Sequence, residues 1–599
     1  MTDAAAGGRY DLRHPDLPRV AGRSARMLAS LIESRTLGPP ILARLIRDAG
    51  ISAFRSRELS EPPTGAPLWP VDGDLAEPGA VIDGIEELLA LRPLTELPYS
   101  TIGDHATAYR TGSATPLAVA EAVLEAMRLA DEAMPPLRAF LSIDRDDVLA
   151  QARESTRRFD RGVPRGPLEG VPVAIKDEVD QRGHPTTVGT SFLGRQPASV
   201  DAIAVARLRA AGALLIGKTN MHEVGIGVTG LNAHHGTARN PHDPERHTGG
   251  SSSGSAAAVA SGLCPAALGA DGGGSIRIPA ALCGLVGLKP TYGRVSETGA
   301  FPLCWSVAHL GPIATTAADA ALLHAILAGP DPADAATLRQ PPVRVDDIAG
   351  GDLSGLVVGV YRPWFEDADP EIVAHCDRMI AVLVDAGARV REVEVPELEL
   401  ARIAHAVTIG SEMAAAMMSH RADRGRHGAD VRINMAIARA FTARDYVHAQ
   451  RARTRVMRHL AAALELADVV VTPATAIVAP VVRADALRGG ESDIAVLSAL
   501  MRFVSIANLT GHPAIAFPAG TTAKGLPIGM QAIGRPWEEH VLLRMARAAE
   551  AAVDRAIPRV GFRPLLEACG RGGERVAGIA QSEPAIESDS GEWYDRRIR

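Results

Sequence analysis

Two glycine- and serine-rich segments of this chain present hydroxyl groups where nucleophilic chemistry could occur. Residues 248–255 read Thr-Gly-Gly-Ser-Ser-Ser-Gly-Ser, and residues 271–279 read Asp-Gly-Gly-Gly-Ser-Ile-Arg-Ile-Pro. Three consecutive glycines let the backbone turn successive N–H groups toward one point, which is the arrangement that binds an oxyanion. The pattern therefore favours Ser275, which follows the glycine run, as a nucleophile beside its own oxyanion hole.

A serine nucleophile needs a base, and the sequence offers two kinds. Five histidines lie between residues 222 and 247, but no complete Gly-x-Ser-x-Gly elbow accompanies them, because Arg277 stands where the second glycine should be. Lys176 directly follows the apolar run 171–175, and a lysine buried at the end of a strand can lose its proton and act as a base. Its position alone leaves an exposed lysine as the alternative.

The segments that would position these residues alternate between strand-like and helix-like patterns. One helix is expected to open at Thr115-Pro116, a good N-cap and first-turn pair. The alternation predicts an α/β fold with a largely parallel or mixed sheet that is covered by helices. Strands are expected at 139–143, 171–175, 214–218, 266–271, 357–361, 390–395, 468–472 and 514–519, and helices at 115–131, 146–159, 201–211, 370–386, 434–467 and 537–553.

The first hundred residues carry an uneven distribution of charge. Residues 19–57 hold eight arginines and two acidic residues, whereas residues 58–100 hold nine acidic residues and one arginine. Apolar residues recur at helical spacing at 27–32 and 41–46, which predicts two short amphipathic helices with basic outer faces. Two interpretations stay open: a solvated face packed on the main body, or a membrane-surface element or substrate lid.

Composition limits the classes to which the protein can belong. Its 599 residues are 46% hydrophobic and 22% charged, as in soluble globular chains, and a formal net charge of −7 gives no global footprint for nucleic acid. Five widely spread cysteines indicate neither a disulfide framework nor a zinc site and favour a reducing compartment. With no signal-peptide pattern, we expect a cytoplasmic protein, with peripheral membrane contact left open.

Taken together, the motif segments resemble the amidase signature family. Residues 249–291 are similar to its central signature almost without interruption, and residues 168–177, Leu-Glu-Gly-Val-Pro-Val-Ala-Ile-Lys-Asp, resemble its strand and lysine. Residues 511–515 and 525–531 are similar to its C-terminal segments, and the resemblance extends over roughly residues 100–560. The family implies a large mixed β-sheet core covered on both faces by helices.

Within the family, the chain most resembles the plant-type fatty acid amide hydrolases. Asn-Pro-His-Asp-Pro-Glu-Arg at 240–246, the glycine triplet, Leu-Met-Arg-Phe at 500–503 and a front extension of about 100 residues all resemble that branch. The resemblance implies an amidase signature catalytic domain at 101–565, preceded by the extension at 1–100 with its amphipathic helices. The residues from Gly570 onward are rich in glycine, serine and charge without periodicity, so we expect a disordered tail at 566–599.

By position, the resemblance implies a Ser-Ser-Lys triad. Ser275 would attack the amide carbonyl, Ser251 would relay its proton, and neutral Lys176 would receive it; the Gly250–Ser251 peptide is expected to be cis. Neither a metal nor an organic cofactor is expected. The remaining site residues are Gly272, Gly273 and Gly274, whose amides would bind the oxyanion, Ser252, a hydrogen-bonding loop residue, and Asp177 and Arg277, which would hold the lysine loop and the Ser275 turn.

The expected function is hydrolysis of amides through an acyl-enzyme, with fatty acid amides such as N-acylethanolamines as substrates. Two alternatives share the triad: an amidase for short-chain or aryl amides, and a component of an amidotransferase that acts on charged transfer RNA. The expected partner is a small-molecule or lipid amide and not a nucleic acid, and a homodimer stays open.

Overall fold

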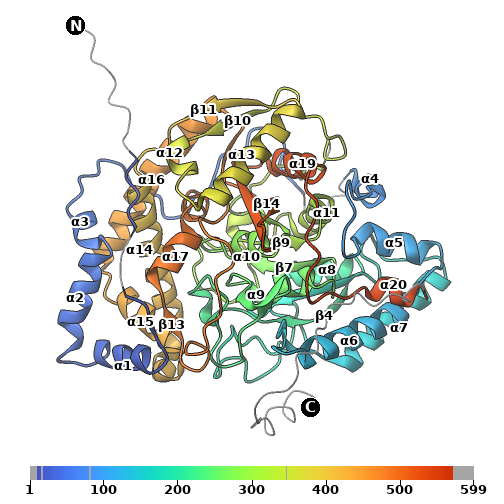
Figure 1. Cartoon of the computed structure of the whole chain (residues 1–599), viewed down its shortest axis with the longest axis horizontal. Coiled ribbons are helices and arrows are strands. Elements are labelled where there is room, and N and C mark those ends of the chain that lie inside the picture. The colour runs from blue at the N-terminus through green and yellow to red at the C-terminus, as the bar shows by residue number, and fades with distance from the viewer. Residues whose placement is uncertain (1–9, 15–17, 78, 80–82, 346, 571–599) are drawn as a thin grey trace.

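The structure is a computed structural model of the chain and describes residues 10–14, 18–77, 79, 83–345 and 347–570. Its centre is a mixed sheet of eleven strands (Figure 1), which confirms the expected α/β fold. In order across the sheet, the strands are β11 (Arg389–Glu392), β10 (Val357–Val360), β12 (Val469–Pro473), β15 (Pro527–Gly534), β14 (Ala514–Thr521), β8 (Val286–Lys289), β9 (Leu310–Ala314), β7 (Ala266–Ala270), β3 (Pro172–Lys176), β4 (Leu214–Thr219) and β2 (Phe140–Ser142).

The pairing of the strands decides where the site can lie. Strand β10 runs parallel to β11 and β12, and β3 runs parallel to β4 and β7. The strands between β12 and β7 pair antiparallel, as do β2 and β4. Because β3 and β7 are parallel neighbours, their carboxyl ends meet at the same edge of the sheet. Lys176 ends β3, and the Ser275 turn follows β7.

Helices cover both faces of the sheet, as the alternation of side chains along a strand requires. Val173 and Ile175 pack into one apolar cluster, and Ala174 between them packs into another on the opposite face. The first face is covered by α8 (Ile203–Ala210), α11 (Ala317–Leu327), α13 (Pro370–Asp385) and α19 (Glu539–Glu550). The second is covered by α6 (Pro116–Glu132), α7 (Arg145–Asp160), α9 (Ser253–Ala260), α10 (Arg277–Leu282), α14 (Leu398–Ala416), α16 (Ala443–Leu466) and α18 (Ser505–Thr510).

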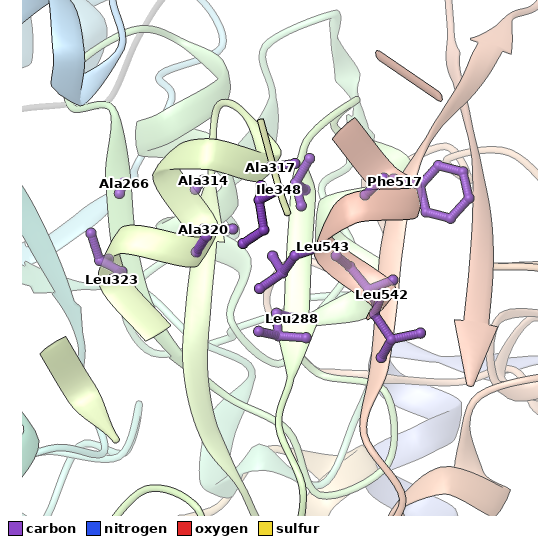
Figure 2. Packing of buried hydrophobic residues seen from close by; sticks show 14 of the residues in the cluster. Ala266, Leu288, Ala314, Ala317, Ala320, Leu323, Ile348, Phe517, Leu542 and Leu543 are labelled. Atoms are coloured by element: carbon purple, nitrogen blue, oxygen red, sulfur yellow. The ribbon is translucent and has the colours of Figure 1, made fainter. Parts of the chain in front are cut away.

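Small and large side chains interlock on the first face. Helices α11 and α19 pack against each other and against the sheet, and Figure 2 shows alanine and leucine side chains where these elements meet. Burial of this apolar surface stabilises the fold by about 25 cal/mol for each Å² removed from water. The residues labelled in Figure 2 are Ala317, Ala320 and Leu323 of α11, Leu542 and Leu543 of α19, and Ala266, Leu288, Ala314, Ile348 and Phe517 around them.

The first three helices of the N-terminal extension pack along one side of the main body, and its fourth helix, α4 (Ile85–Ala90), lies on the opposite side (Figure 1). The two predicted amphipathic helices are present as α1 (Gly22–Ile32) and α2 (Gly38–Asp48), followed by α3 (Ile51–Arg55). Buried residues of α1 contact α15 (Ala429–Ala438), and strand β1 (Val20–Ala21) pairs with β13 (Glu491–Ser492). The remaining helices are α5 (Ile102–Arg110), α12 (Arg362–Phe365), α17 (Ile494–Met501) and α20 (Pro564–Ala568).

The predicted strands are all present, but the expected helix at 434–467 is wrong in its extent. Two helices, α15 and α16, replace it, because Thr442 and Asp445 form a capping box that starts a new helix. Helix α20 crosses the expected boundary between residues 565 and 566, and residues 571–599 of the expected tail lie outside the described residues. In the described part of the chain, no helix combines the length and apolar character that a membrane span requires.

Candidate active site

Lys176 is buried at the carboxyl end of β3, where its amine faces three oxygen atoms. Its side chain is 1% exposed. The amine Nζ lies 2.8 Å from Ser251 Oγ, 3.0 Å from the Ala270 carbonyl oxygen and 3.1 Å from Glu178 Oε2. The exposed lysine that its position left open is therefore not what the structure contains. Parallel pairing of β3 with β7 explains the contact with Ala270, which ends β7.

The loop that carries Ser251 is fixed on both sides of that residue. The Gly250–Ser251 peptide is cis, as expected, and the Ser251 carbonyl accepts a hydrogen bond from the amide of His222 at 3.1 Å. Ser252 Oγ donates to the Ala270 carbonyl at 3.2 Å and accepts from the Ala270 amide at 3.3 Å. These bonds tie the loop to the end of β7, next to the amine of Lys176, and agree with the structural role expected of Ser252.

The turn before Ser275 is organised around the buried carboxylate of Asp271. That carboxylate accepts hydrogen bonds from the amides of Gly274 at 2.6 Å and Ile276 at 3.1 Å, and it forms an ion pair with Arg277 at 3.0 Å. Burial alone would raise the pKa of Asp271, but the Arg277 guanidinium and these hydrogen bonds hold that pKa well below its usual range. An ionised carboxylate thus fixes the backbone on both sides of the serine.

Steric contacts explain why all three residues before Ser275 are glycines. Gly274 has φ of +109°, and a Cβ there would lie 2.5 Å from Val504 Cγ2. At Gly272 a Cβ would lie 2.9 Å from Cys304 Sγ, and at Gly273 it would lie 2.9 Å from His405 Cε1. A side chain at any of the three positions would therefore displace a neighbour or strain the turn.

The backbone amides of the glycine turn differ in whether they are already hydrogen-bonded. The Gly274 amide already donates to Asp271, so it holds the turn and is not free for an oxyanion, contrary to the sequence expectation. The amides of Gly272, Gly273 and Ser275 make no hydrogen bond with any residue that the structure describes. Gly272, Gly273 and Ser275 also line a large cavity, so their donors can serve a bound group there.

Arg277 and Asp177 occupy the supporting positions expected of them. The buried guanidinium of Arg277 donates to Asn508 Oδ1, Gln531 Oε1 and the Val504 carbonyl, at distances between 2.6 and 2.9 Å. Asp177 accepts from the amides of Thr187 and Gly189, both at 3.2 Å, and lies 3.4 Å from Lys218 Nζ. Asp177 and Arg277 are absent from the cavity wall, and their hydrogen bonds hold the segments that carry Lys176 and Ser275.

His405, on α14, is a site residue that the sequence analysis did not identify. Its Nε2 donates to the Gly272 carbonyl at 2.7 Å, since a carbonyl oxygen can only accept. Burial lowers the pKa of His405 to about 4, although the bond to Gly272 opposes the shift, so the imidazole is neutral near pH 7. The signal was weak, because His405 lies in a helix buried on most sides, whose sequence lacks a clear amphipathic period.

The histidines that the sequence placed near the serines do not serve as the base. His222 pairs with Asp430 at 3.1 Å, and His242 bonds the Cys283 carbonyl. The imidazoles of His222, His234, His235, His242 and His247 are absent from the wall of the cavity onto which Ser275 opens. Among the described residues, the basic group that contacts Ser251 is Lys176.

Ser275, Ser251 and Lys176 line one cavity of about 580 Å³. That volume lies within the roughly 300–1,000 Å³ of small-molecule sites. Its walls come from the catalytic body and from the N-terminal extension, which contributes Leu28 of α1 and Leu45 of α2. Most of the other side chains of the wall are apolar, including Ile409, Met413, Ile433, Ile437, Phe441, Leu497 and Met501 from α14, α15, α17 and the segment after α15.

Comparison with known proteins places this geometry in a family. Residues 121–543 match the family model described as Amidase. A fatty acid amide hydrolase of Arabidopsis thaliana is 39% identical over 90% of this chain and 94% of its own length. The matching subunit of the glutamyl-tRNA(Gln) amidotransferase of Roseiflexus is 37% identical over 77% of this chain and 98% of its own length.

A solved structure supports the same assignment. The peptide amidase of Stenotrophomonas maltophilia superposes with a TM-score of 0.67 at 30% identity, over 76% of this chain and 98% of that protein. The match therefore includes the main body of the fold and almost all of the solved relative. This chain belongs to the amidase signature family.

Proposed function

We propose that this chain is a serine amidase that hydrolyses fatty acid amides, such as N-acylethanolamines, to a fatty acid and an amine. The observation that carries the proposal is the cavity, because Ser275 opens onto about 580 Å³ of space with mainly apolar walls. Hydrocarbon that leaves water for such walls gains about 0.8 kcal/mol for each buried CH₂ group. A long acyl chain is therefore the substrate part that this cavity suits best.

The contact of Lys176 with Ser251, and the cavity that both share with Ser275, support a proton route for acylation. Ser275 attacks the amide carbonyl, Ser251 accepts its proton, and the proton of Ser251 passes to neutral Lys176 across the 2.8 Å contact. The developing oxyanion faces the unpaired amides of Gly272, Gly273 and Ser275. In comparable sites one such donor is worth about 3–4 kcal/mol of transition-state stabilisation.

The second half of the reaction reverses the proton route. The leaving amine takes a proton from Ser251, which regains one from Lys176, and the fatty acid stays bound to Ser275 as an ester. Water then attacks the ester while Ser251 and Lys176 again remove a proton, and this proton returns to Ser275 as the fatty acid leaves. Every step uses side chains and amides that line the cavity.

The length of the chain argues against the amidotransferase alternative. The amidotransferase relative is matched over 98% of its own length and still leaves nearly a quarter of this chain without a counterpart. The plant hydrolase leaves only a tenth unmatched. Leu28 and Leu45 of the extension line the cavity, so the extension takes part in forming the site.

The surface of the extension supports peripheral contact with a membrane. Met27 and Leu37 are 64% and 52% exposed, and arginines Arg23, Arg26, Arg35, Arg44 and Arg47 are exposed around them. Apolar side chains among cations suit an anionic lipid surface.

The state of the cysteines bears on the compartment. All five cysteines are free thiols, which supports a reducing, cytoplasmic compartment.

A panel of acyl lengths tests the proposal. Ethanolamides of butanoic, octanoic, dodecanoic and hexadecanoic acid share one amine, so differences in kcat/KM report the acyl site alone. We expect kcat/KM to rise at least ~100-fold from the shortest to the longest chain, and Ser275→Ala to remove activity on all of them. A panel in which the butanoyl amide is the best substrate would contradict long-chain specificity and favour the short-chain alternative.

A further inference from the structure

The backbone of Gly225 faces both Ser251 and the carboxylate of Glu178 across the wall of the cavity. A Cβ added to Gly225 would lie 3.6 Å from Ser251 Oγ, 3.8 Å from Glu178 Oε2 and 3.4 Å from Leu303 Cδ1. These are ordinary contact distances, so the bare backbone of Gly225 leaves room for at least one substituent atom beside both polar groups. Gly225, Glu178, Ser251 and Leu303 all line the cavity of Ser275.

The proton route decides which part of the substrate enters this space. The leaving nitrogen must approach Ser251, since Ser251 returns its proton, and the Lys176 amine behind Ser251 lies 3.1 Å from Glu178 Oε2. The carbonyl oxygen faces the glycine turn, and the acyl chain requires the apolar part of the cavity. The amine substituent is therefore directed toward the carboxylate of Glu178.

A second acidic side chain lies in the wall of the cavity, in addition to Glu178. Glu297 lines the same cavity and makes no side-chain hydrogen bond with a described residue. Burial raises the pKa of Glu297 well above its usual value, and the nearby acidic groups Asp334, Glu178 and Glu412 add to the shift. The surroundings of Glu297 thus resist a further negative charge, and its carboxyl has hydrogen-bonding capacity to offer a ligand.

We propose that the space bounded by Gly225, Glu178 and Glu297 is the subsite for the leaving amine, and that it selects amines bearing hydrogen-bond donors, neutral or cationic, against amines bearing a carboxylate. The proposal rests on the amide hydrolysis proposed above and specifies the amine side of its substrates. An acidic conjugate would bring a carboxylate next to Glu178, where like charges repel. A hydroxyl or ammonium group would instead donate to the carboxyl groups there.

The test compares three amides of dodecanoic acid, with ethanolamine, ethylenediamine and glycine as the amines. In the wild-type enzyme, kcat/KM for the glycine conjugate should be at least ~10-fold below the values for the other two amides. Hydrolysis at similar rates, or a preference for the glycine conjugate, would overturn the subsite. Failure to hydrolyse any dodecanoyl amide would instead overturn the proposed function, so the two failures are distinguishable.

Two variants locate the selectivity. The readout is the ratio of kcat/KM for the glycine conjugate to that for the ethanolamide, in which a general loss of catalytic rate cancels. Glu178→Gln should raise this ratio at least ~5-fold. Glu297→Gln should raise it by a smaller factor of at least ~2, because burial raises the pKa of Glu297 and so disfavours its charged form. The exposed Glu125, which pairs with Arg128 on α6, provides the control Glu125→Gln, with an unchanged ratio. An unchanged ratio in both cavity variants would contradict the proposal.

Discussion

His405 is placed to strengthen one of the amides that face the cavity. Its Nε2–H donates to the Gly272 carbonyl at 2.7 Å, and that carbonyl belongs to the same peptide unit as the Gly273 amide. A peptide whose carbonyl accepts a hydrogen bond becomes a better donor at its N–H, because neighbouring hydrogen bonds polarise one another. His405 is therefore a positioning residue that acts through Gly273 and not a base.

Replacing His405 should lower kcat more than it changes KM. We expect His405→Ala to reduce kcat by ~10-fold, less than the loss of a whole oxyanion donor, since the Gly273 amide itself remains. His405→Gln, whose amide can still donate, should recover part of the rate. Steady-state kinetics on a soluble amide measures both constants, and a variant that raises KM with kcat intact would assign His405 to substrate binding alone.

At the scale of elements, helix α1 presents three different surfaces in one turn. Ala25 and Ala29 are buried against α15, Leu28 lines the cavity, and Met27 is exposed to solvent. The two interpretations of the basic amphipathic helices are thus not exclusive, because α1 is packed on the main body and also forms part of the cavity wall. The sequence of α1 predicts an amphipathic helix from its period. It does not predict which of the apolar side chains lines a cavity.

Two neighbouring residues of α1 separate these roles. Leu28→Asp places a charge in the cavity wall and should lower kcat/KM for a hexadecanoyl amide at least ~10-fold more than for a butanoyl amide. Met27→Asp, its matched control, should leave both values within about twofold in solution and weaken binding to anionic vesicles, measured by co-sedimentation. Equal losses on long and short amides in Leu28→Asp would argue against a role of α1 in the acyl site.

The elements that could be predicted from sequence were those with a strong local pattern. The run before Lys176 reads as a buried strand, and Thr115-Pro116 marks the start of α6, whose Thr115 side chain caps Ala118. Helices α11 and α14 were missed because they are buried on most sides and lack an amphipathic period. Strands β8 and β9 were missed because they are short and contain glycine or proline.

The site was predictable to the extent that it lies in continuous motifs. Lys176, Ser251 and Ser275 come from three such segments. Parallel pairing of β3 with β7 brings the first and the last together, and the hydrogen bonds between Ser252 and Ala270 hold Ser251 beside them. His405 and Glu297 reach the same cavity from distant segments without a motif, so nothing local marked them. The hydrogen bond from the Gly274 amide to the Asp271 carboxylate depends on the rotamer of Asp271, and a sequence motif does not specify a rotamer.

At the scale of the whole molecule, buried histidines make the fold sensitive to acid. Burial lowers the pKa to about 4 for His105, His242, His324 and His405, and to about 3 for His247 and His512. Below pH 6.5 the unfolded chain binds protons that the folded chain does not, so stability falls as pH decreases toward 4. Burial raises the pKa of Asp319 to about 7 and also raises the pKa of Glu297, Glu412 and Glu550, and these acids act in the opposite direction. The carboxylates of Asp271 and Glu539, whose pKa values arginine partners hold low despite burial, add to the loss of stability in acid.

His324 offers a direct test of this linkage. Neither of its ring nitrogens has a hydrogen-bond partner among the described residues, and the side chain is fully buried in α11. The melting temperature of the wild-type protein should fall between pH 7 and pH 5, and in His324→Leu the fall should be smaller by about 1–2 °C. Differential scanning calorimetry gives both slopes, and identical slopes would show that His324 does not titrate on unfolding.

In the proposed mechanism, Ser275 is the nucleophile and Lys176 activates it through Ser251. The most direct measurement is mass spectrometry of peptides from the enzyme after reaction with a long-chain fluorophosphonate, which traps an activated serine. We predict a covalent adduct on Ser275, none on Ser251, and labelling at least ~100-fold slower in Lys176→Ala with the same melting temperature. An adduct on Ser251, or labelling of Ser275 at the wild-type rate in Lys176→Ala, would contradict the account.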